Sequence, residues 1–155
     1  IIFCSWQQLN EIKDYAKQFG FNHAMPLFFI KSTSSQVLKA NMRICGATET
    51  ALVLYRDKLP KFNNNGRMIL DWFAYDRGGN YPKIHPTQKP VSVLKQLIEI
   101  YTDPYDVVID PVAGSASTLR ACAELGRSCY GFEIKKDFYN LAKEKMLSNV
   151  QTQLF

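Results

Sequence analysis

The sequence predicts an α/β fold in which helices sandwich a mostly parallel central sheet. The first observation is that apolar runs of strand length alternate with segments of helical periodicity. The second is a strand–turn–helix–strand order, with strand patterns at Val107–Ile109 and Ser128–Phe132 on either side of a helix pattern at Leu119–Leu125. The third is a composition of 46% hydrophobic and 21% charged residues over 155 positions, which fits one soluble globular domain.

The remaining elements follow from the same two periodicities. Ser5 and Gln8 form a capping-box pattern before a helix that Gly20 ends, and Pro90 fits the first position of a later helix. Val107–Ile109 is apolar throughout, which is the pattern of a strand buried on both faces. The expected elements are, in order, strand 1–4, helix 6–19, strand 25–30, strand 50–55, helix 91–101, strand 107–109, helix 119–125, strand 128–132 and helix 136–146.

The turn after Asp110 has the features of a nucleotide-binding βαβ unit. Small residues at positions 113–117 let the backbone approach a ligand, and free amides at a helix start favour a carboxylate or phosphate. Glu133 follows Gly114 by 19 positions, close to the spacing at which an acid holds ribose hydroxyls in such units. Since the second glycine of G-x-G is missing, a βαβ unit in which Gly114 only makes a tight turn is the alternative.

Two segments of the chain are expected to be irregular. Residues 32–45 are polar and read as a loop, with basic Lys39 and Arg43. Residues 56–84 mix basic and aromatic side chains, a composition that suits nucleic acid. Asn65-Gly66 is a turn signal and would suit the tip of a hairpin. The predicted DNA-contacting residues of this segment are Arg56, Lys58, Lys61, Arg67, Arg77 and Lys83. A solvated surface loop is the alternative, and the net charge of +5 favours a polyanionic partner only mildly.

Several broad features bound the class of protein. The four cysteines form no C-x-x-C pair, so we expect free thiols in a reducing cytoplasm and no metal site. No apolar run approaches the roughly 20 residues that span a membrane. The chain begins directly in a strand pattern at Ile1–Cys4, so we expect residues upstream of it to be missing.

Three motifs resemble one known family. His85-Pro-Thr-Gln-Lys-Pro90, then Asp110-Pro-Val-Ala-Gly-Ser-Ala-Ser-Thr118, then Gly131-Phe-Glu133 is similar to the C-terminal half of an amino-methyltransferase of DNA. The closest class places the cofactor motifs after the catalytic motif, as in phage and restriction–modification enzymes. The resemblance is specific over residues 85–146 and looser over 1–58. It implies a single Rossmann-like methyltransferase domain over 1–155, N-terminally incomplete, with 56–84 as a DNA-recognition insertion.

The resemblance implies S-adenosylmethionine as the methyl donor. Glu133 would hold the ribose hydroxyls, while Thr87 and Lys89 would reach the methionine carboxylate. The implied cofactor-binding residues are Thr87, Lys89, Asp110, Pro111, Gly114, Ser115, Ser117 and Glu133. A loop histidine before proline, as at His85, is more often structural than a general base.

Two departures from the family pattern stand out. Ala116 and Ser117 occupy positions where the family prefers glycine and threonine, and Ala116 would be strained at positive φ. The catalytic motif D/N-P-P-Y/F/W occurs nowhere in the chain, and Asp103-Pro-Tyr105 lacks its second proline. We therefore expect no catalytic residue in these 155 positions, the motif to lie upstream of Ile1, and the chain alone to be inactive.

The function expected from the resemblance is methylation of adenine N6 in double-stranded DNA by a cytoplasmic enzyme. Cytosine N4 methylation and a non-catalytic cofactor-binding or DNA-binding prophage relic are the alternatives, and a homodimer is left open. A nicotinamide-dependent oxidoreductase is disfavoured by the missing G-x-G-x-x-G and by the motif at His85–Pro90.

Overall fold

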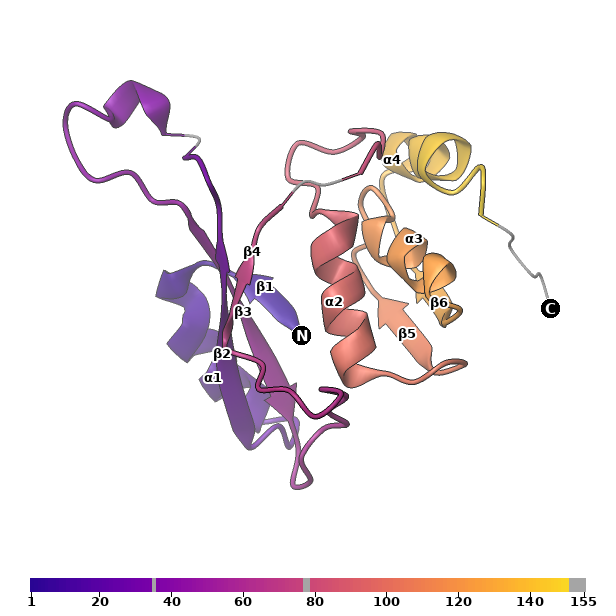
Figure 1. The fold of residues 1–155 in the computed structure, drawn as a ribbon, viewed down its shortest axis with the longest axis horizontal. Helices are drawn as coiled ribbons and strands as arrows, with labels where there is room; N and C mark the ends of the chain where they lie inside the picture. The colour runs from indigo at the N-terminus through magenta and orange to yellow at the C-terminus, as the bar shows by residue number, and fades with distance from the viewer. Residues whose placement is uncertain (35, 77–78, 151–155) are drawn as a thin grey trace. The chain divides into compact units, whose positions relative to one another are not determined.

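The computed structural model describes residues 1–34, 36–76 and 79–150, and the chain forms two compact units. The first unit holds residues 1–60 and 64–76, and the second holds 61–63 together with the chain from 77 onward. Figure 1 shows the first unit to be built mainly of strands and the second to be rich in helices. The expectation of one methyltransferase domain over 1–155 stays a prediction.

A four-stranded sheet forms the centre of the first unit. Its strands are β1 (Ile2–Cys4), β2 (His23–Ile30), β3 (Thr48–Tyr55) and β4 (Trp72–Ala74), in the order β1-β3-β2-β4. β3 pairs antiparallel with both β1 and β2, while β4 pairs parallel with β2. β2 and β3 follow one another along the chain without a crossover helix between them, the arrangement typical of an antiparallel pair. The α/β class is confirmed, but the sheet is mixed rather than mostly parallel.

The N-terminal segment of the first unit follows the predicted capping pattern. The Ser5 amide and hydroxyl both donate to Oε1 of Gln8, at 3.1 and 3.0 Å, at the start of the 3-10 turn η1 (Trp6–Gln8). Helix α1 (Leu9–Lys17) continues from it, and the turn after α1 ends at Gly20 with a φ of +80°. β1 is an edge strand, so Ile2 is exposed and the strand is not fully buried.

The second unit contains the strand–turn–helix–strand segment. Strands β5 (Val107–Asp110) and β6 (Ser128–Gly131) are parallel, and helix α3 (Ser117–Glu124) connects them. Helix α2 (Val91–Tyr101) packs on α3, and α4 (Lys136–Leu141) continues as the π-helical segment η3 (Ala142–Met146). Pro90 caps α2 from one position outside it.

Close packing of α3 against β6 depends on the glycine at the end of that strand. A Cβ at Gly131 would lie 2.5 Å from Cδ1 of Leu119 and 3.1 Å from the Cβ of Ala113. A side chain at this position would therefore force Leu119 and Ala113 to move, and glycine allows the close approach of helix and strand. The contact also holds the segment after Asp110 against the strand that leads to Glu133.

One face of the β5–β6 pair is open in the described part of the chain. Val107 is 57% exposed and Ile109 is 63% exposed, whereas Val108 between them is half-buried. The prediction that Val107–Ile109 is buried on both faces is therefore wrong for the described residues. A continuous apolar run predicts that both faces of a strand are covered. In the described residues α3 packs against β5 and β6, while Val107 and Ile109 remain exposed.

The irregular segments are more ordered than predicted. Residues 56–76 include β4, which the sequence pattern missed. Asn65 and Gly66 have φ of +50° and +71°, so the predicted turn is confirmed, but no strand flanks it and it is not a hairpin tip. The loop between β2 and β3 contains the 3-10 turn η2 (Val37–Lys39). None of the helices in the described ranges has the length and hydropathy of a membrane span.

Candidate functional site

The carboxylates of Asp110 and Glu133 come from the same end of two adjacent parallel strands. Asp110 pairs in register with Gly131, so Glu133 lies just beyond the end of β6. The Phe132 amide donates to the Asp110 carbonyl at 3.0 Å, and the Ala113 amide donates to the Phe132 carbonyl at 2.9 Å. The two strand ends are therefore joined by backbone bonds at the edge where open α/β sheets bind ligands.

Glu133 is held by two backbone amides. Its Oε1 accepts from the Lys135 amide at 2.8 Å and its Oε2 from the Gly114 amide at 2.9 Å. The hydrogen bonds from the Lys135 and Gly114 amides, together with the charge of Lys135, hold the pKa of this carboxyl below its usual range. Glu133 is therefore ionised at neutral pH, and each oxygen keeps a lone pair for a further donor.

The Gly114 amide is not available to a ligand, because it is bonded to Glu133. The glycine turn and the acid 19 residues later thus form one hydrogen-bonded unit before any ligand arrives. The sequence spacing located both residues, but it did not indicate that they contact each other. The carboxylate takes the place that an anion would take at this turn.

The turn between β5 and α3 uses two left-handed residues. Gly114 has a φ of +55°, which glycine adopts freely, and Ala116 has φ +60° and ψ +28°. An alanine in this region is strained by roughly 1–2 kcal/mol. Ala116 is also only 3% exposed, so its methyl group is enclosed. The strain expected for Ala116 at positive φ is therefore present in this loop.

Ser115 and Ser117 are buried within the turn. Their hydroxyl oxygens lie 2.9 Å apart and share one hydrogen bond. Buried hydroxyls that satisfy each other shape the turn. These two side chains therefore stabilise the loop. The backbone of the loop, rather than the two hydroxyls, is the part that could contact a ligand. Asp110 acts similarly, since its Oδ1 accepts from the Val112 amide at 3.1 Å, one residue past Pro111.

The segment before α2 is organised by Gln88. Its Oε1 accepts from the Ile84 amide and its Nε2 donates to the Pro82 carbonyl, both at 2.9 Å. Sequence reasoning missed this role, although a glutamine inside a proline-flanked loop is a residue that can bond the backbone on two sides. Gln88 thereby fixes the loop that carries the half-buried Lys89.

His85 is bonded within the same loop. Its Nδ1 lies 3.2 Å from the Thr87 amide and 3.0 Å from the Thr87 hydroxyl, and its ring centroid is 4.5 Å from that of Phe138. A backbone amide can only donate, so Nδ1 accepts and carries no proton in this arrangement. These contacts give His85 a structural role and orient the exposed Thr87.

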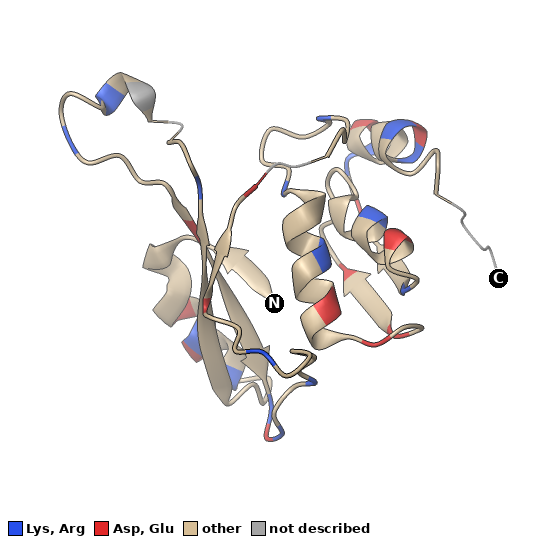
Figure 2. Ribbon diagram, in the orientation of Figure 1, with Lys and Arg blue, Asp and Glu red and all other residues tan. Residues whose placement is uncertain are grey.

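The predicted DNA-contacting residues are divided between the two units. Arg56, Lys58 and Arg67 belong to the first unit, Lys61 and Lys83 belong to the second, and Arg77 lies outside the described residues. All five described side chains are exposed, and Figure 2 shows basic positions along this stretch.

Lys61 and Arg56 have partners of their own. The Nζ of Lys61 lies 2.5 Å from Asp103 and 3.4 Å from Asp106, and both carboxylates raise the pKa of Lys61. Arg56 lies over the ring of Phe21, with its guanidinium carbon 5.5 Å from the ring centroid. Asp103 therefore serves an ion pair in the described structure, and a DNA phosphate would have to compete with it for Lys61.

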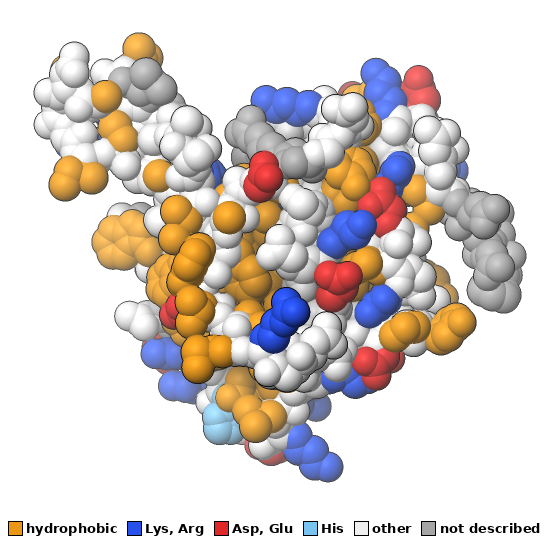
Figure 3. Space-filling view, viewed as in Figure 1, with side chains coloured by type: hydrophobic (Ala, Val, Ile, Leu, Met, Phe, Trp, Pro, Cys, Tyr) orange, Lys and Arg blue, Asp and Glu red, His pale blue; other side chains and the backbone are white. Residues whose placement is uncertain are grey.

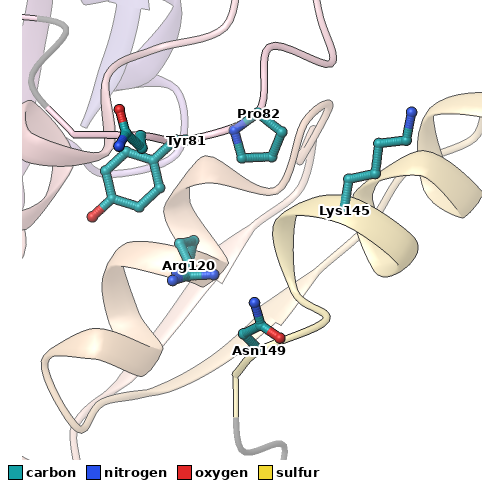
Figure 4. Close-up of a pocket in the computed structure, with 6 residues that line it drawn as sticks. Tyr81, Pro82, Arg120, Lys145 and Asn149 are labelled. Atoms are coloured by element: carbon teal, nitrogen blue, oxygen red, sulfur yellow. The ribbon is translucent and has the colours of Figure 1, made fainter.

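A polar pocket of about 660 Å³ lies elsewhere in the second unit (Figure 4). It is lined by Asn80, Tyr81, Pro82, Arg120, Lys145 and Asn149. Arg120 donates from Nε to Glu124 at 2.6 Å and from Nη1 to the Met146 carbonyl at 2.9 Å, and it lies over the Tyr81 ring. Arg120 thus joins α3 to the end of η3, which makes this wall of the pocket a structural joint.

The fold and site define an α/β protein with a nucleotide-cofactor turn, and the comparison with family models agrees with that class. The model described as DNA methylase, of the N6 and N4 type, matches residues 1–144. The chain therefore belongs to the DNA methylase family, as the three sequence motifs predicted. Members of this family use S-adenosylmethionine as methyl donor.

Individual relatives are similar over most of the chain. YubD of Escherichia coli (strain K12) is 29% identical over 148 residues, covering 94% of this chain and 60% of YubD. The DNA adenine methyltransferase YhdJ of the same organism is 26% identical over 137 residues, covering 84% of this chain and 46% of YhdJ. The chain thus spans about half of the length of these two relatives.

The solved structure of the M1.HpyAVI–SAM complex has a similar fold. It superposes with a TM-score of 0.79 at 26% sequence identity, covering 93% of this chain and 72% of that one. This agreement confirms the Rossmann-like methyltransferase fold predicted from the motifs.

The residues present here fit such a cofactor. Glu133 is an ionised acceptor at the strand end, and a Cβ at Gly114 would meet nothing nearer than the Val112 carbonyl at 3.9 Å, so the loop surface is open there. A carboxylate with spare lone pairs beside an open backbone turn suits a ribose diol.

Proposed function

We propose that this chain binds S-adenosylmethionine and forms the cofactor half of a DNA methyltransferase that methylates adenine at N6. The observation that carries the proposal is the contact between Glu133 and the Gly114 amide, which fixes an ionised carboxylate at the end of β6 next to Asp110. S-adenosylmethionine supplies an electrophilic methyl group when it is bound. The residues of this chain bind and orient that group, and they do not act on the methyl acceptor.

The roles of the cofactor residues follow from their chemistry. Glu133 accepts hydrogen bonds from the ribose hydroxyls, and the left-handed turn at Gly114 presents backbone to the cofactor. Lys89 and Thr87 face the methionine carboxylate, since an ammonium makes a charge-assisted bond to it. Asp110 and Pro111 end the strand, while Ser115 and Ser117 keep the turn in shape through their shared hydrogen bond.

The partner we propose is double-stranded DNA. The described basic residues of 56–84, which are Arg56, Lys58, Lys61, Arg67 and Lys83, are exposed and suit phosphate contacts. The choice of adenine is supported by the similarity to YhdJ, which is named a DNA adenine methyltransferase. Methylation of cytosine N4 is the alternative within the same family, and the base that is modified in digested DNA distinguishes the two.

One observation favours a second candidate, a non-catalytic protein that binds the cofactor weakly. Ala116 is strained where the family prefers glycine. Ala116→Gly relieves roughly 1–2 kcal/mol of strain. It also loses about 0.8 kcal/mol for the buried methyl group and about 0.4–1 kcal/mol through a more flexible unfolded chain.

These three effects nearly cancel, so the free energy of unfolding of Ala116→Gly should change by less than about 1 kcal/mol. If Ala116 distorts the cofactor turn, the variant binds S-adenosylmethionine much more tightly at nearly unchanged stability. Calorimetry and denaturant unfolding measure the two quantities. Equal affinities of the variant and the parent remove the support for this second candidate.

The proposed function is tested by methyl transfer. Transfer requires the amine nitrogen to be held in line with the methyl group, and the family uses D/N-P-P-aromatic for this step, which these 155 residues lack. We expect no tritiated methyl transfer to mixed-sequence DNA by the 155-residue chain and clear transfer to adenine by the product of the complete reading frame. Turnover by the isolated chain contradicts the assignment of roles. A complete protein that binds cofactor without transferring methyl favours the non-catalytic candidate.

A further inference from the structure

The connection between β2 and β3 extends beyond the ends of both strands (Figure 1). We call residues 31–47 the arm. At its base, the Lys31 amide donates to the Ala47 carbonyl at 2.7 Å, which continues the pairing of the two strands. The sequence pattern of residues 32–45 predicts a polar loop, and the predicted DNA-contacting residues all lie in 56–84.

The arm has a defined conformation in its described part. The Ser34 hydroxyl donates to the Gly46 carbonyl at 2.7 Å, which joins its two sides. The Arg43 guanidinium donates to Oε1 of Gln36 at 3.2 Å, and the Cys45 thiol donates to the Gln36 carbonyl at 3.3 Å. These bonds cross the arm and shape its outer part around η2. The described part of the arm therefore has a defined structure that its own hydrogen bonds hold.

Three large apolar side chains of the arm are exposed to solvent. Leu38 is 97% exposed, Met42 is 83% exposed and Ile44 is 96% exposed. Figure 3 shows several separate hydrophobic side chains on the surface of the projecting segment. Three large, exposed apolar side chains within one short segment indicate a contact surface, because single ones are common on proteins but several in one place are unfavourable in water.

The charge of the arm identifies the partner. Residues 31–47 include Lys31, Lys39 and Arg43 and no aspartate or glutamate. Lys31 pairs with Glu49 at 2.5 Å, while Lys39 and Arg43 are exposed among the apolar side chains. Leucine, isoleucine and methionine flanked by cations are the side chains with which proteins open base steps from the minor groove of DNA. A polyanion with an apolar interior therefore fits both features of the arm.

We propose that the arm enters the minor groove of double-stranded DNA, with Leu38, Met42 and Ile44 as an apolar wedge against the bases. Lys39 and Arg43 lie on the flanking phosphates. This inference rests on the proposed function, since it takes DNA as the partner. It adds a recognition element in the first unit to the basic residues of 56–84.

The test separates the apolar part of the arm from its charge. One variant is Leu38→Ser/Met42→Ser/Ile44→Ser, and the other is Lys39→Gln/Arg43→Gln. The matched control is Lys13→Gln/Lys17→Gln on α1 in the same unit, where Lys17 is exposed and Lys13 is half-buried. Binding to a duplex that contains 2-aminopurine is followed by anisotropy and by fluorescence, because an inserted side chain unstacks the probe. Circular dichroism confirms that each variant is folded.

We expect the triple serine variant to bind DNA at least about tenfold more weakly, to lose the 2-aminopurine signal, and to keep the salt dependence of the parent. The charge variant should lower the slope of log affinity against log salt by about 1.8, for two phosphate contacts. The control should leave both unchanged. A triple serine variant that binds DNA as the parent does overturns the proposal, as does one that loses only self-association or binding to anionic vesicles.

Methyl transfer by the product of the complete reading frame distinguishes the two proposals. If that protein methylates DNA and the arm variants bind and methylate as the parent does, the arm proposal falls and the proposed function stands. If the product of the complete reading frame neither binds DNA nor transfers methyl, the proposed function is wrong. The arm proposal, which takes DNA as the partner, is then wrong as well.

Discussion

The turn at residues 110–117 and the arm at residues 31–47 both follow a strand, and they hold their side chains in opposite ways. In the turn, Ser115, Ala116 and Ser117 are buried, and a carboxylate from the next strand end is bonded to its backbone. In the arm, backbone and polar groups form the internal bonds, while the apolar side chains point into solvent.

The difference separates two ways of binding. A turn that binds a small ligand contacts it mainly with its backbone. Its side chains therefore make the internal contacts that hold the backbone in position. A surface for a macromolecule works through side chains that remain outside, and its backbone only has to carry them. Substitutions in the turn should therefore change stability, whereas matched substitutions in the arm should not.

The largest effect is expected for Ala116→Val. A β-branched side chain at φ +60° adds to the strain already present, and the site is buried, so the variant should lose about 2–4 kcal/mol of stability. The matched change Ala40→Val, at an exposed position of the arm, should stay within about 0.5 kcal/mol of the parent. Urea unfolding measures both. Equal losses in the two variants contradict the contrast between turn and arm.

A smaller effect is expected for Gly131→Ala. The new methyl group would overlap Leu119 and crowd Ala113, so stability should fall by about 1–3 kcal/mol. The arm offers the matched change Gly46→Ala, because no atom lies within 4 Å of a Cβ there and its φ is not positive. That variant should be neutral or more stable by about 0.4–1 kcal/mol.

A second substitution checks the cause of the Gly131→Ala loss. Combining it with Leu119→Ala removes the overlapping atoms, so the double variant should lose less than the sum of the two single losses. Strictly additive losses in thermal or urea unfolding contradict the packing explanation.

The smallest effect concerns pH. The pKa of Glu133 is lowered in the folded protein, so its bonds to the two amides stabilise the fold above the unfolded pKa of about 4.3 and are lost as pH falls through the folded value. Glu133→Gln should therefore lower the melting temperature at pH 7. The difference from the parent should shrink as the pH is taken below about 4. A difference that is constant over this range shows that the charge of Glu133 does not contribute.

The turn was predictable from sequence because its chemistry is local. A short apolar run, a proline, a glycine and an acid 19 residues later lie in one continuous segment, so their spacing indicates the geometry. The helix end at Gly20 and the capping box at Ser5 were predictable for the same reason. Each depends on residues within one or two turns of chain.

Features that depend on distant partners were not predictable. The mixed pairing of β2 and β3 with β1 and β4 depends on tertiary assembly. β4 has only three residues, too few to show a periodic strand pattern in the sequence. The ion pair of Lys61 with Asp103 joins residues 42 positions apart, so the sequence of the basic loop could not show that Lys61 has a structural partner. The arm was missed because exposed apolar residues in a polar segment have no periodicity.

Binding of S-adenosylmethionine to the 155-residue chain tests the central claim most directly. Isothermal calorimetry should show binding of S-adenosylmethionine in preference to NAD. Glu133→Ala should weaken it roughly tenfold to a hundredfold, the scale of a hydrogen bond to a charged group. The matched control Glu144→Ala, at an exposed position of η3, should bind as the parent does. Tight binding of NAD with none of S-adenosylmethionine, or a Glu133→Ala variant that binds as the parent does, contradicts the account.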